Sequence, residues 1–299
     1  MFTRVTCAVA CCFTLAVAAT QNAIPPELAA MAEAEREFAR TATVKGWRDA
    51  FLEFFADDSI AFTPKVASAK QRLRKQPATP FSVFELVWEP RTGDVADAGD
   101  LGWLTGPSTS INHKTPDKKP GYGCYLSVWR KQPDERWKVF IDVGTNAPQP
   151  VTFPPGLTRT TLENRYVAKR RDQESKDAAT RSLADADRAL NARIAEQGIV
   201  PAFVSVLAPA ARLHRPGWVP TVGREAITKW LDQHATAGTA THESAEAAAS
   251  ADFGYAYGRF EVKGPTPSGG VYVRLWSRDA TGRWWLIVDV AQIFKPDEK

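Results

Sequence analysis

The residues best suited to chemistry in this chain are two carboxylates, a histidine and a set of aromatic side chains. Asp142 and Asp289 each stand between two apolar residues, so each is expected inside a strand. Burial in a strand would raise the pKa of the carboxyl group and suit it to general acid or base catalysis. A carboxylate at a sheet edge or paired with an arginine would serve structure alone. We favour this second interpretation because structural ion pairs are common.

His214 directly precedes Arg215 at the end of a short predicted strand. Its imidazole could act as a base or hold a ligand at the mouth of a pocket, although a lone histidine in a strand is more often a hydrogen-bonded structural residue. The candidate catalytic residues are therefore His214 and Asp289. The four histidines show no metal-binding spacing, so the sequence predicts no metal site. It also contains no glycine-rich phosphate loop, and no cofactor is predicted.

Aromatic residues offer walls for a ligand pocket. Tyr255 and Tyr257 are two residues apart and so face the same side of their strand. Core or sheet packing is the usual role of such residues and remains the alternative. The candidate ligand-binding residues are Tyr255, Tyr257, Tyr272, Trp218, Trp230, Trp47, Trp103 and Asp142.

An internal repeat sets the frame for these residues. The segment AEAER at 32–36 matches ADADR at 184–188, an offset of 184 − 32 = 152. The same offset pairs Gly46 with Gly198, Ala50 with Ala202, Phe51 with Phe203, Pro64 with Pro216 and Gly106 with Gly258. Later in each half the offset is 276 − 129 = 147, which pairs Trp129 with Trp276, Trp137 with Trp284 and Asp142 with Asp289. The first half thus carries five extra residues (152 − 147), which we place in a hairpin loop at 112–121.

Each half is predicted to form helices first and strands afterwards. The expected helices span 27–45, 47–55 and 68–75 in the first half, and 161–197, 200–207 and 224–234 in the second. The expected strands of the first half span 60–62, 84–88, 101–105, 122–129 and 137–143, with partners in the second half that begin at 212–214. This order predicts an α+β fold, with helices packed on one face of an antiparallel sheet.

Short motifs that recur in a shared order carry a family resemblance. Residues 56–62 (ADDSIAF) resemble the turn into the first strand of the nuclear transport factor 2-like superfamily, and 222–227 (VGREAI) resemble the start of its third helix. Residues 135–140 (ERWKVF) and 282–287 (GRWWLI) resemble its last strand. The SnoaL-like and ketosteroid isomerase-like branch is the most similar.

The resemblance implies two tandem cone-shaped domains, each with three helices on a curved antiparallel sheet around an apolar pocket. Members commonly dimerise through the open sheet face, so the two halves would pair as a pseudo-dimer within one chain, and a homodimer of the whole chain is a further expectation. In steroid isomerase-like members a carboxylate just before the proline that ends the first strand is the general base. Here that position is Thr63 in the first half and Arg215 in the second. Neither accepts a proton at neutral pH.

The two ends of the predicted first domain are marked by composition. Residues 1–19 hold one arginine, a short apolar run and small residues at a cleavage site, which is the pattern of a secretory signal. We therefore expect a secreted or periplasmic protein, and we do not predict a lipoprotein. A proline-rich linker at 147–160 separates a first domain at 27–146 from a second at 161–296.

Charge and cysteine content exclude several classes. The formal charge of +4 is spread among almost equal numbers of acidic and basic residues, so nucleic acid is not an expected partner. No other apolar stretch is long enough to span a membrane. Cys124 is the one cysteine outside the signal, so no intrachain disulfide is expected in the mature chain.

Three functions remain. The leading hypothesis is binding of a small apolar or amphipathic molecule without a defined reaction, because the carboxylate of the isomerase-like members is missing. The first alternative is a SnoaL-like cyclase, isomerase or hydro-lyase that uses His214 or Asp289 as acid or base. The second is a structural or interaction module in which the first half serves only as the partner of the second.

Overall fold

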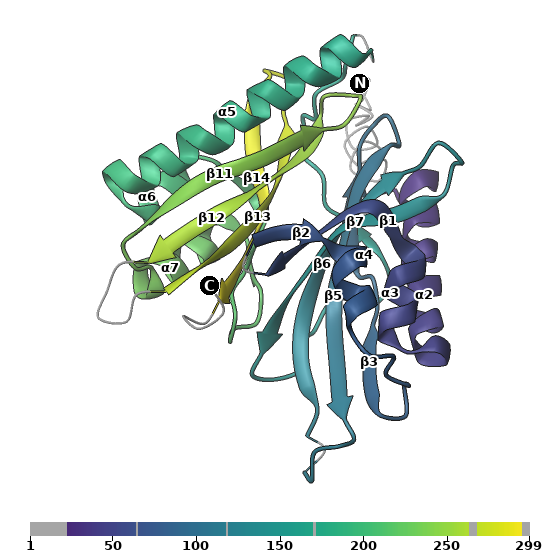
Figure 1. The fold of residues 1–299 in the computed structure, drawn as a ribbon. Coiled ribbons are helices and arrows are strands. Elements are labelled where there is room, and N and C mark those ends of the chain that lie inside the picture. Colours follow the sequence, from purple (N-terminus) through teal and green to yellow (C-terminus); the bar gives the residue numbers. More distant parts are fainter. Residues whose placement is uncertain (1–22, 64, 118, 170–171, 263–267, 295–299) are drawn as a thin grey trace, which may run out of the picture.

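The computed structural model describes residues 23–63, 65–117, 119–169, 172–262 and 268–294. The signal predicted at 1–19 lies outside these residues. The described part contains six helices and two sheets, with three helices and one sheet in each half (Figure 1). The predicted α+β class is confirmed.

The first half begins with helices and continues into an eight-stranded sheet. Its elements are α2 (Pro26–Lys45), α3 (Trp47–Phe54), β1 (Phe55–Thr63), β2 (Lys65–Ser68), α4 (Ala69–Lys75), β3 (Phe84–Trp88), β4 (Thr92–Val95), β5 (Leu101–Asn112), β6 (Gly121–Lys131), β7 (Trp137–Ala147) and β8 (Thr158–Arg159). The strand order is β2-β1-β7-β6-β5-β4-β8, and β3 also pairs with β5. The loop between β5 and β6 coincides with the predicted site of the five extra residues.

The second half repeats this order with a six-stranded sheet. Its elements are α5 (Gln173–Gln197), α6 (Ile199–Val204), β9 (Leu207–His214), β10 (Thr221–Val222), α7 (Arg224–His234), β11 (Gly238–Ala247), β12 (Phe253–Val262), β13 (Ser268–Arg278) and β14 (Trp284–Phe294). The strand order is β10-β9-β14-β13-β12-β11. In both sheets the first long strand runs parallel to the last one, and the remaining long strands are antiparallel.

The break between the first two helices of each half has the same cause. Gly46 and Gly198 both adopt a positive φ, of 82° and 86°, which an L side chain rarely tolerates. Each glycine ends one helix and allows the next to start in a new direction. These two residues are partners at the repeat offset of 152.

The start of the long helix of the second half corrects a prediction. Helix α5 begins at Gln173, where Asp172 caps it by accepting a hydrogen bond from the Ser175 N–H, and not at 161. The described residues before it do not form a helix, because the linker returns to the first sheet and adds β8 beside β4, and a turn follows at 163–164. The predicted linker therefore contains a strand.

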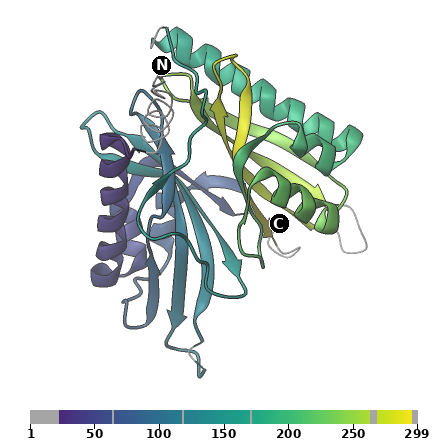
Figure 2. The same cartoon turned by 180° about the vertical axis from the view of Figure 1, so that it is seen from behind.

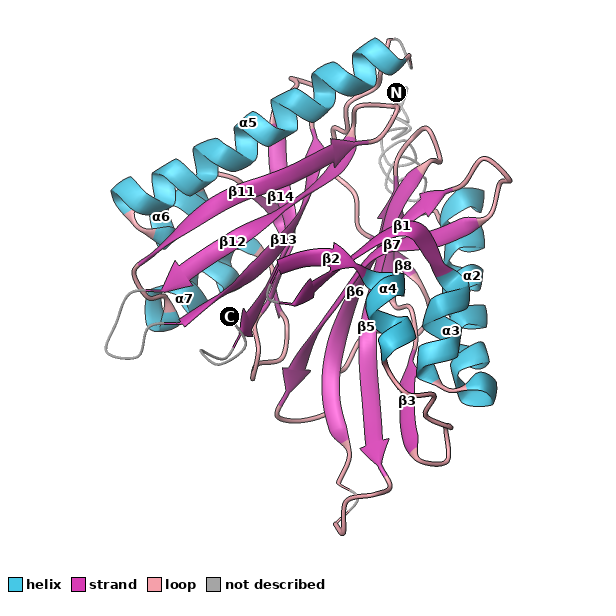
Figure 3. Ribbon diagram, viewed as in Figure 1, coloured by secondary structure: helices cyan, strands magenta, loops and turns pink. Residues whose placement is uncertain are grey.

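The two sheets pack against each other between two sets of helices. Helices α2 and α3 lie on one side of the molecule and α5 and α6 on the opposite side, with the strands between them (Figures 2 and 3). One hydrophobic cluster joins Leu126 and Val128 of β6 to Val273 of β13 and Val288 of β14. Both faces of the central strands are therefore buried, one against helices and one against the other half.

Candidate functional site

A cavity of about 230 Å³ lies inside the second half, between its helices and its sheet. Its polar lining includes the charged residues Arg215, Arg274, Asp289 and Glu261, together with the hydroxyl groups of Tyr272, Thr236 and Thr239. Phe203, Trp218, Trp230, His234 and Phe260 contribute aromatic lining, and Ile194, Ile199, Ala291 and Ile293 contribute aliphatic lining. The cavity thus combines an apolar wall with a small number of charged groups, as ligand pockets commonly do.

Three aromatic rings in mutual contact form the open edge of this cavity. Helix α7 presents Trp230 and His234 one turn apart, and their ring centroids lie 4.7 Å from each other. The indole of Trp218 meets both rings, with centroid distances of 5.6 Å to Trp230 and 4.5 Å to His234. Trp218 is 44% exposed, so this side of the cavity faces solvent.

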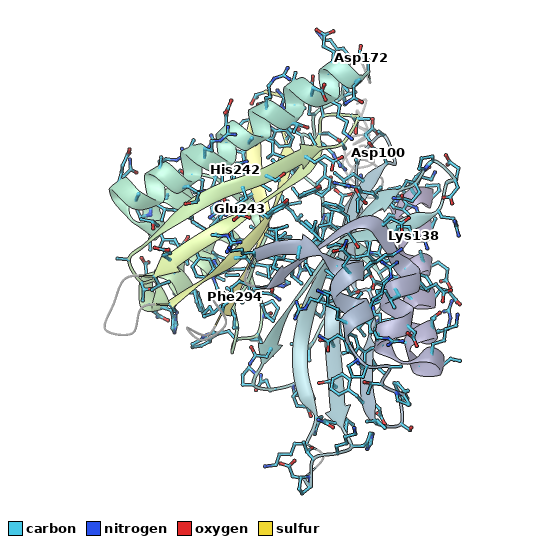
Figure 4. All side chains as sticks on the ribbon, in the orientation of Figure 1. Asp100, Lys138, Asp172, His242, Glu243 and Phe294 are labelled. Carbon is cyan, nitrogen blue, oxygen red and sulfur yellow. The ribbon has the colours of Figure 1, made fainter. Side chains whose placement is uncertain are left out.

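Helix α5 supplies the polar groups behind the cavity. Asp187, Asn191 and Ile194 recur at three- and four-residue spacing and share the buried face of the helix. The carboxylate of Asp187 accepts hydrogen bonds from Arg274 Nη1 at 2.9 Å and from the Tyr272 hydroxyl at 2.7 Å. His242 of β11, which is labelled in Figure 4, lies 2.8 Å from the same carboxylate through its Nδ1 atom. A helix and two strands are therefore tied together by one buried acid.

Asp289 is bound by two arginines. Arg274 of β13 and Asp289 of β14 are direct cross-strand partners, and Arg274 Nε donates to Asp289 Oδ2 at 2.9 Å. Arg215 follows β9, and its Nη2 lies 2.5 Å from Asp289 Oδ1. Both oxygens of this pocket-lining carboxylate are thus engaged with cations.

The electrostatics of the network keep Asp187 charged. Burial by itself would raise the pKa of Asp187, but Arg274 and the hydrogen bonds from His242 and Tyr272 outweigh it, so this pKa is lowered. Burial raises the pKa of the Tyr272 hydroxyl far above its ordinary value, which keeps the phenol neutral. The groups of the network carry compensating charges in neutral solution.

One donor of this network remains unused. Arg274 donates from Nε to Asp289 and from Nη1 to Asp187 and to Asn191 Oδ1 at 2.7 Å. Its Nη2 hydrogens bond to no acceptor among the described residues. Because Arg274 lines the cavity, these hydrogens are available to an acceptor inside it.

A glycine makes room for the Tyr272 side chain. Gly258 of β12 is the direct cross-strand partner of Tyr272. A Cβ atom at Gly258 would lie 2.6 Å from the Tyr272 hydroxyl oxygen. Any side chain at position 258 would therefore displace the ring from Asp187.

The structure places four of the predicted residues at the cavity, namely Trp218, Trp230, Tyr272 and Asp289. Tyr255 and Tyr257 do share one face of β12, as predicted, but that face packs against the first half. The Tyr257 ring lies 5.4 Å from that of Phe62, and the Tyr255 ring lies 5.5 Å from that of Phe140. Their expected role as pocket lining is corrected to packing between the halves.

His214 also lies away from the cavity. Its direct partner in β14 is Val290, which faces the first half, whereas the neighbouring Asp289 faces the cavity. The imidazole is fully buried, and neither ring nitrogen forms a hydrogen bond with any residue that the structure describes. Burial, reinforced by Arg212 and Arg215, lowers its pKa to about 3, so the ring is neutral. The expected catalytic role of His214 is corrected, because it does not reach the ligand space.

The predicted residues of the first half occupy different surroundings. Trp103 is fully buried in the cluster that joins the two sheets. Trp47 packs on Phe51 at a centroid distance of 5.9 Å, within an aromatic group under α2 and α3. Asp142 of β7 is half-buried and is the direct cross-strand partner of Ser127.

Equivalent positions of the two halves hold different chemistry. At the repeat offsets, Glu35 corresponds to Asp187 (35 + 152) and Ser127 corresponds to Arg274 (127 + 147). Glu35 accepts hydrogen bonds from Ser127 Oγ and Trp88 Nε1, both at 2.6 Å. Without a cation at position 127, burial raises the pKa of Glu35 to about 7, and burial together with the Glu35 charge raises that of Asp142 to about 8.

Sequence reasoning missed Asp187, Asn191, His242 and Arg274. Asp187 belongs to the repeated ADADR segment, so its recurrence was visible, but an acid in a charged helix usually faces water. Within the ranges that the structure describes, no group of three or more His, Cys, Asp or Glu residues could hold a metal ion. In the same part of the chain, no helix is both long and apolar enough to cross a membrane.

Comparisons with known proteins give similarity in structure alone. No protein-family model and no curated protein matches the sequence. An NTF2-like protein of unknown function from Pseudomonas putida KT2440 is similar, with 12% identity, a TM-score of 0.34, and coverage of 41% of this chain and 93% of that one. A ketosteroid isomerase-like protein from Erwinia carotovora atroseptica SCRI1043 has 18% identity and a TM-score of 0.34 over 40% of this chain and 96% of its own. A Mycobacterium tuberculosis protein in complex with estradiol-17beta-hemisuccinate has 15% identity and a TM-score of 0.32 over 40% of this chain and 97% of its own.

Proposed function

We propose that the second half of this protein binds a small amphipathic molecule that carries a hydrogen-bond acceptor. The observation that carries this proposal is the 230 Å³ cavity with aromatic rings at its open edge and the unused Arg274 Nη2 donor in its polar lining. The apolar body of the ligand would pack between Phe203 and Trp230, and its carbonyl or carboxylate oxygen would meet Arg274.

The size of the cavity limits the ligand. A volume of about 230 Å³ lies below the roughly 300 Å³ at which pockets for drug-sized molecules begin. The expected ligand is therefore a molecule of one or two fused rings, or an aliphatic chain of similar volume. Burial of its apolar surface would provide most of the affinity, at about 25 cal/mol per Å².

The contacts of the Asp289 carboxylate with two arginines favour a binding role for the cavity over proton transfer. A general base needs a free lone pair within reach of the substrate. Oδ2 of Asp289 accepts a hydrogen bond from Arg274 at 2.9 Å, and Arg215 stands in ion-pair contact with Oδ1 at 2.5 Å, where it obstructs the approach of a substrate. Arg215 also occupies the position at which the isomerase-like members carry their base.

We further propose that the chain is a tandem duplication of a nuclear transport factor 2-like unit, with the halves paired as a pseudo-dimer. The repeat offsets of 152 and 147 support the duplication, and the packing of one sheet on the other supports the pairing. A secreted or periplasmic location remains a proposal that rests on the sequence of residues 1–19.

A matched ligand series tests the binding proposal. 2-Acetylnaphthalene, 2-naphthoate and naphthalene share one apolar body and differ in the acceptor. We expect the two acceptor-bearing compounds to raise the melting temperature in a saturable manner and naphthalene to raise it less, because binding to the native state alone is stabilising. Equal behaviour of the three compounds, or no shift with any of them, would contradict the proposed ligand class.

A cavity-filling variant identifies the site. Ala291 lines the cavity and is 7% exposed, so Ala291→Phe would place a ring in the ligand space. Val44→Phe, at a position that is 82% exposed on α2, is the control of equal side-chain size. Ligand shifts that disappear in Ala291→Phe and persist in Val44→Phe would support this cavity, and shifts that persist in both would place binding elsewhere.

A further inference from the structure

A second cavity, of about 160 Å³, lies between the linker and the edge of the second sheet. Gln149, Val151, Thr152 and Phe153 of the linker form one wall. Arg212 of β9 contributes to the opposite wall. Because its lining includes neither Arg274 nor Tyr272, this cavity is separate from the proposed ligand pocket.

Arg212 is a cation without a compensating anion. It makes no ion pair and no hydrogen bond with any described residue, and its Nε atom is buried without an acceptor. The acidic group that acts on it is the Cys124 thiol, whose pKa burial raises to about 11, so the thiol is neutral. The neighbouring Arg215 is already paired with Asp289. Arginine forms planar, paired hydrogen bonds with carboxylate and phosphate groups, and the half-buried Arg212 side chain has no such partner among the described residues.

The local structure holds the guanidinium at the cavity. Its Cζ atom lies 5.4 Å from the centroid of the Phe153 ring, a cation–π contact that joins the linker to β9. Thr152 and Gln149 add a hydroxyl and an amide group, which are neutral donors for an oxygen ligand. The positive potential extends inward, since Arg212 also lowers the pKa of buried His214.

We propose that this cavity is a binding site for a small oxyanion, the phosphate or carboxylate group of a small molecule, held by Arg212 between the linker and the second half. A volume of 160 Å³ accommodates one such group with little apolar attachment. Occupation would neutralise the charge of Arg212, which no acid of the described residues compensates. It would also fasten residues 149–153 to β9.

Titration with inorganic phosphate and with acetate, each exchanged for chloride at constant ionic strength, tests the site. We expect one of them to raise the melting temperature in a saturable manner, and the ³¹P resonance to broaden if phosphate is the ligand. Arg212→Gln should weaken binding by at least about tenfold, because a charge-assisted pair is lost, and Arg212→Lys should retain part of it. Arg74→Gln, at an exposed arginine of α4, should bind as the unmodified protein does.

The variants separate binding from general salt effects. Phosphate also stabilises folded proteins by exclusion from their surfaces. A shift of equal size in the unmodified protein and in Arg212→Gln would therefore overturn the proposal. If Arg212→Gln does not fold, the absence of saturable heat on titration of the unmodified protein with either anion would overturn it equally.

Discussion

The carboxylate of Asp100, which precedes β5 and is labelled in Figure 4, accepts a hydrogen bond of 2.9 Å from the backbone N–H of Ala249, before β12. A second contact mirrors it, because the N–H of Asp97 donates to Asp252 Oδ2 at 3.0 Å. At the offset of 152, Asp97 corresponds to Ala249 and Asp100 to Asp252. Reciprocal contacts of this kind are the mark of an isologous interface, in which residue i meets j and j meets i. This supports the proposed pseudo-dimer.

The reciprocal pair predicts two unequal stability effects. Asp100→Ala leaves the Ala249 N–H without its acceptor and should lower the free energy of unfolding by about 1–2 kcal/mol. Asp252→Ala should cost about 3 kcal/mol or more, because Asp252 is fully buried and also pairs with Arg165 at 2.6 Å. Urea unfolding measures both, with exposed Asp134→Ala as the control. Losses no larger than that of the control would show that these contacts do not hold the halves together.

The buried network of the second half predicts a rescue experiment. Arg274→Met should lower the free energy of unfolding by about 3–5 kcal/mol, because Asp187 and Asp289 would lose their shared cation. Adding Asp187→Asn and Asp289→Asn removes the unpaired charges and should restore about 2 kcal/mol or more. Urea unfolding of the single and triple variants makes the comparison. A triple variant no more stable than the single one would show that packing of Arg274, and not its charge, is what matters.

The sequence predicted the scaffold better than the site, and the reason is physical. Helix boundaries followed from local signals, such as Gly46 and Gly198, which act on neighbouring residues. The start of α5 was missed because the residues before it are held by partners distant in sequence, β8 by β4 and Arg165 by Asp279. Likewise, β3 and β4 occupy the place that the single strand β11 fills in the second half.

The orientation of the strand residues was the main error in the site. A period of two shows that Tyr255 and Tyr257 share a face, but it does not show which face lines the cone. In this protein both faces of β12 are buried, so polarity along the strand carries no signal. His214 was expected at the pocket for the same reason, because the sequence does not show which face of its strand the imidazole occupies. Arg274 was missed because a charged residue inside a strand reveals its role only through partners on α5 and β14.

The acids of the first half predict how stability depends on pH. The pKa of Glu35 is about 7 and that of Asp142 about 8 in the folded protein, both above their ordinary values near 4. The folded state therefore binds more protons than the unfolded state, and this contribution is present at low pH and is lost as the pH rises towards 8. His214 acts in the opposite direction, because its pKa of about 3 makes stability rise with pH up to about 6.5. The net decline should be steepest between about pH 6.5 and 8.

Urea unfolding at several pH values tests this, with Glu35→Gln as the variant. Each extra proton contributes a slope of up to about 1.4 kcal/mol per pH unit. Glu35→Gln removes one such proton and the charge that raises the pKa of Asp142, so the decline above pH 6.5 should become clearly shallower. Glu37→Gln, on the exposed face of the same helix, should leave the profile unchanged. Parallel profiles for the unmodified protein and Glu35→Gln would rule out a buried, protonated Glu35.

The final prediction separates His214 from the ligand site. Its ring is fully buried with two unsatisfied nitrogens, so His214→Leu replaces an unpaired polar group by an apolar one of similar volume. This should raise the free energy of unfolding by about 1 kcal/mol and should make the decline of stability with pH steeper between about 5 and 6.5, because the opposing contribution of His214 is lost. Ligand shifts in the melting temperature should be unchanged, because the ring faces the first half and not the cavity. A loss of stability together with a loss of ligand response would instead return His214 to the pocket and restore it as a candidate acid or base.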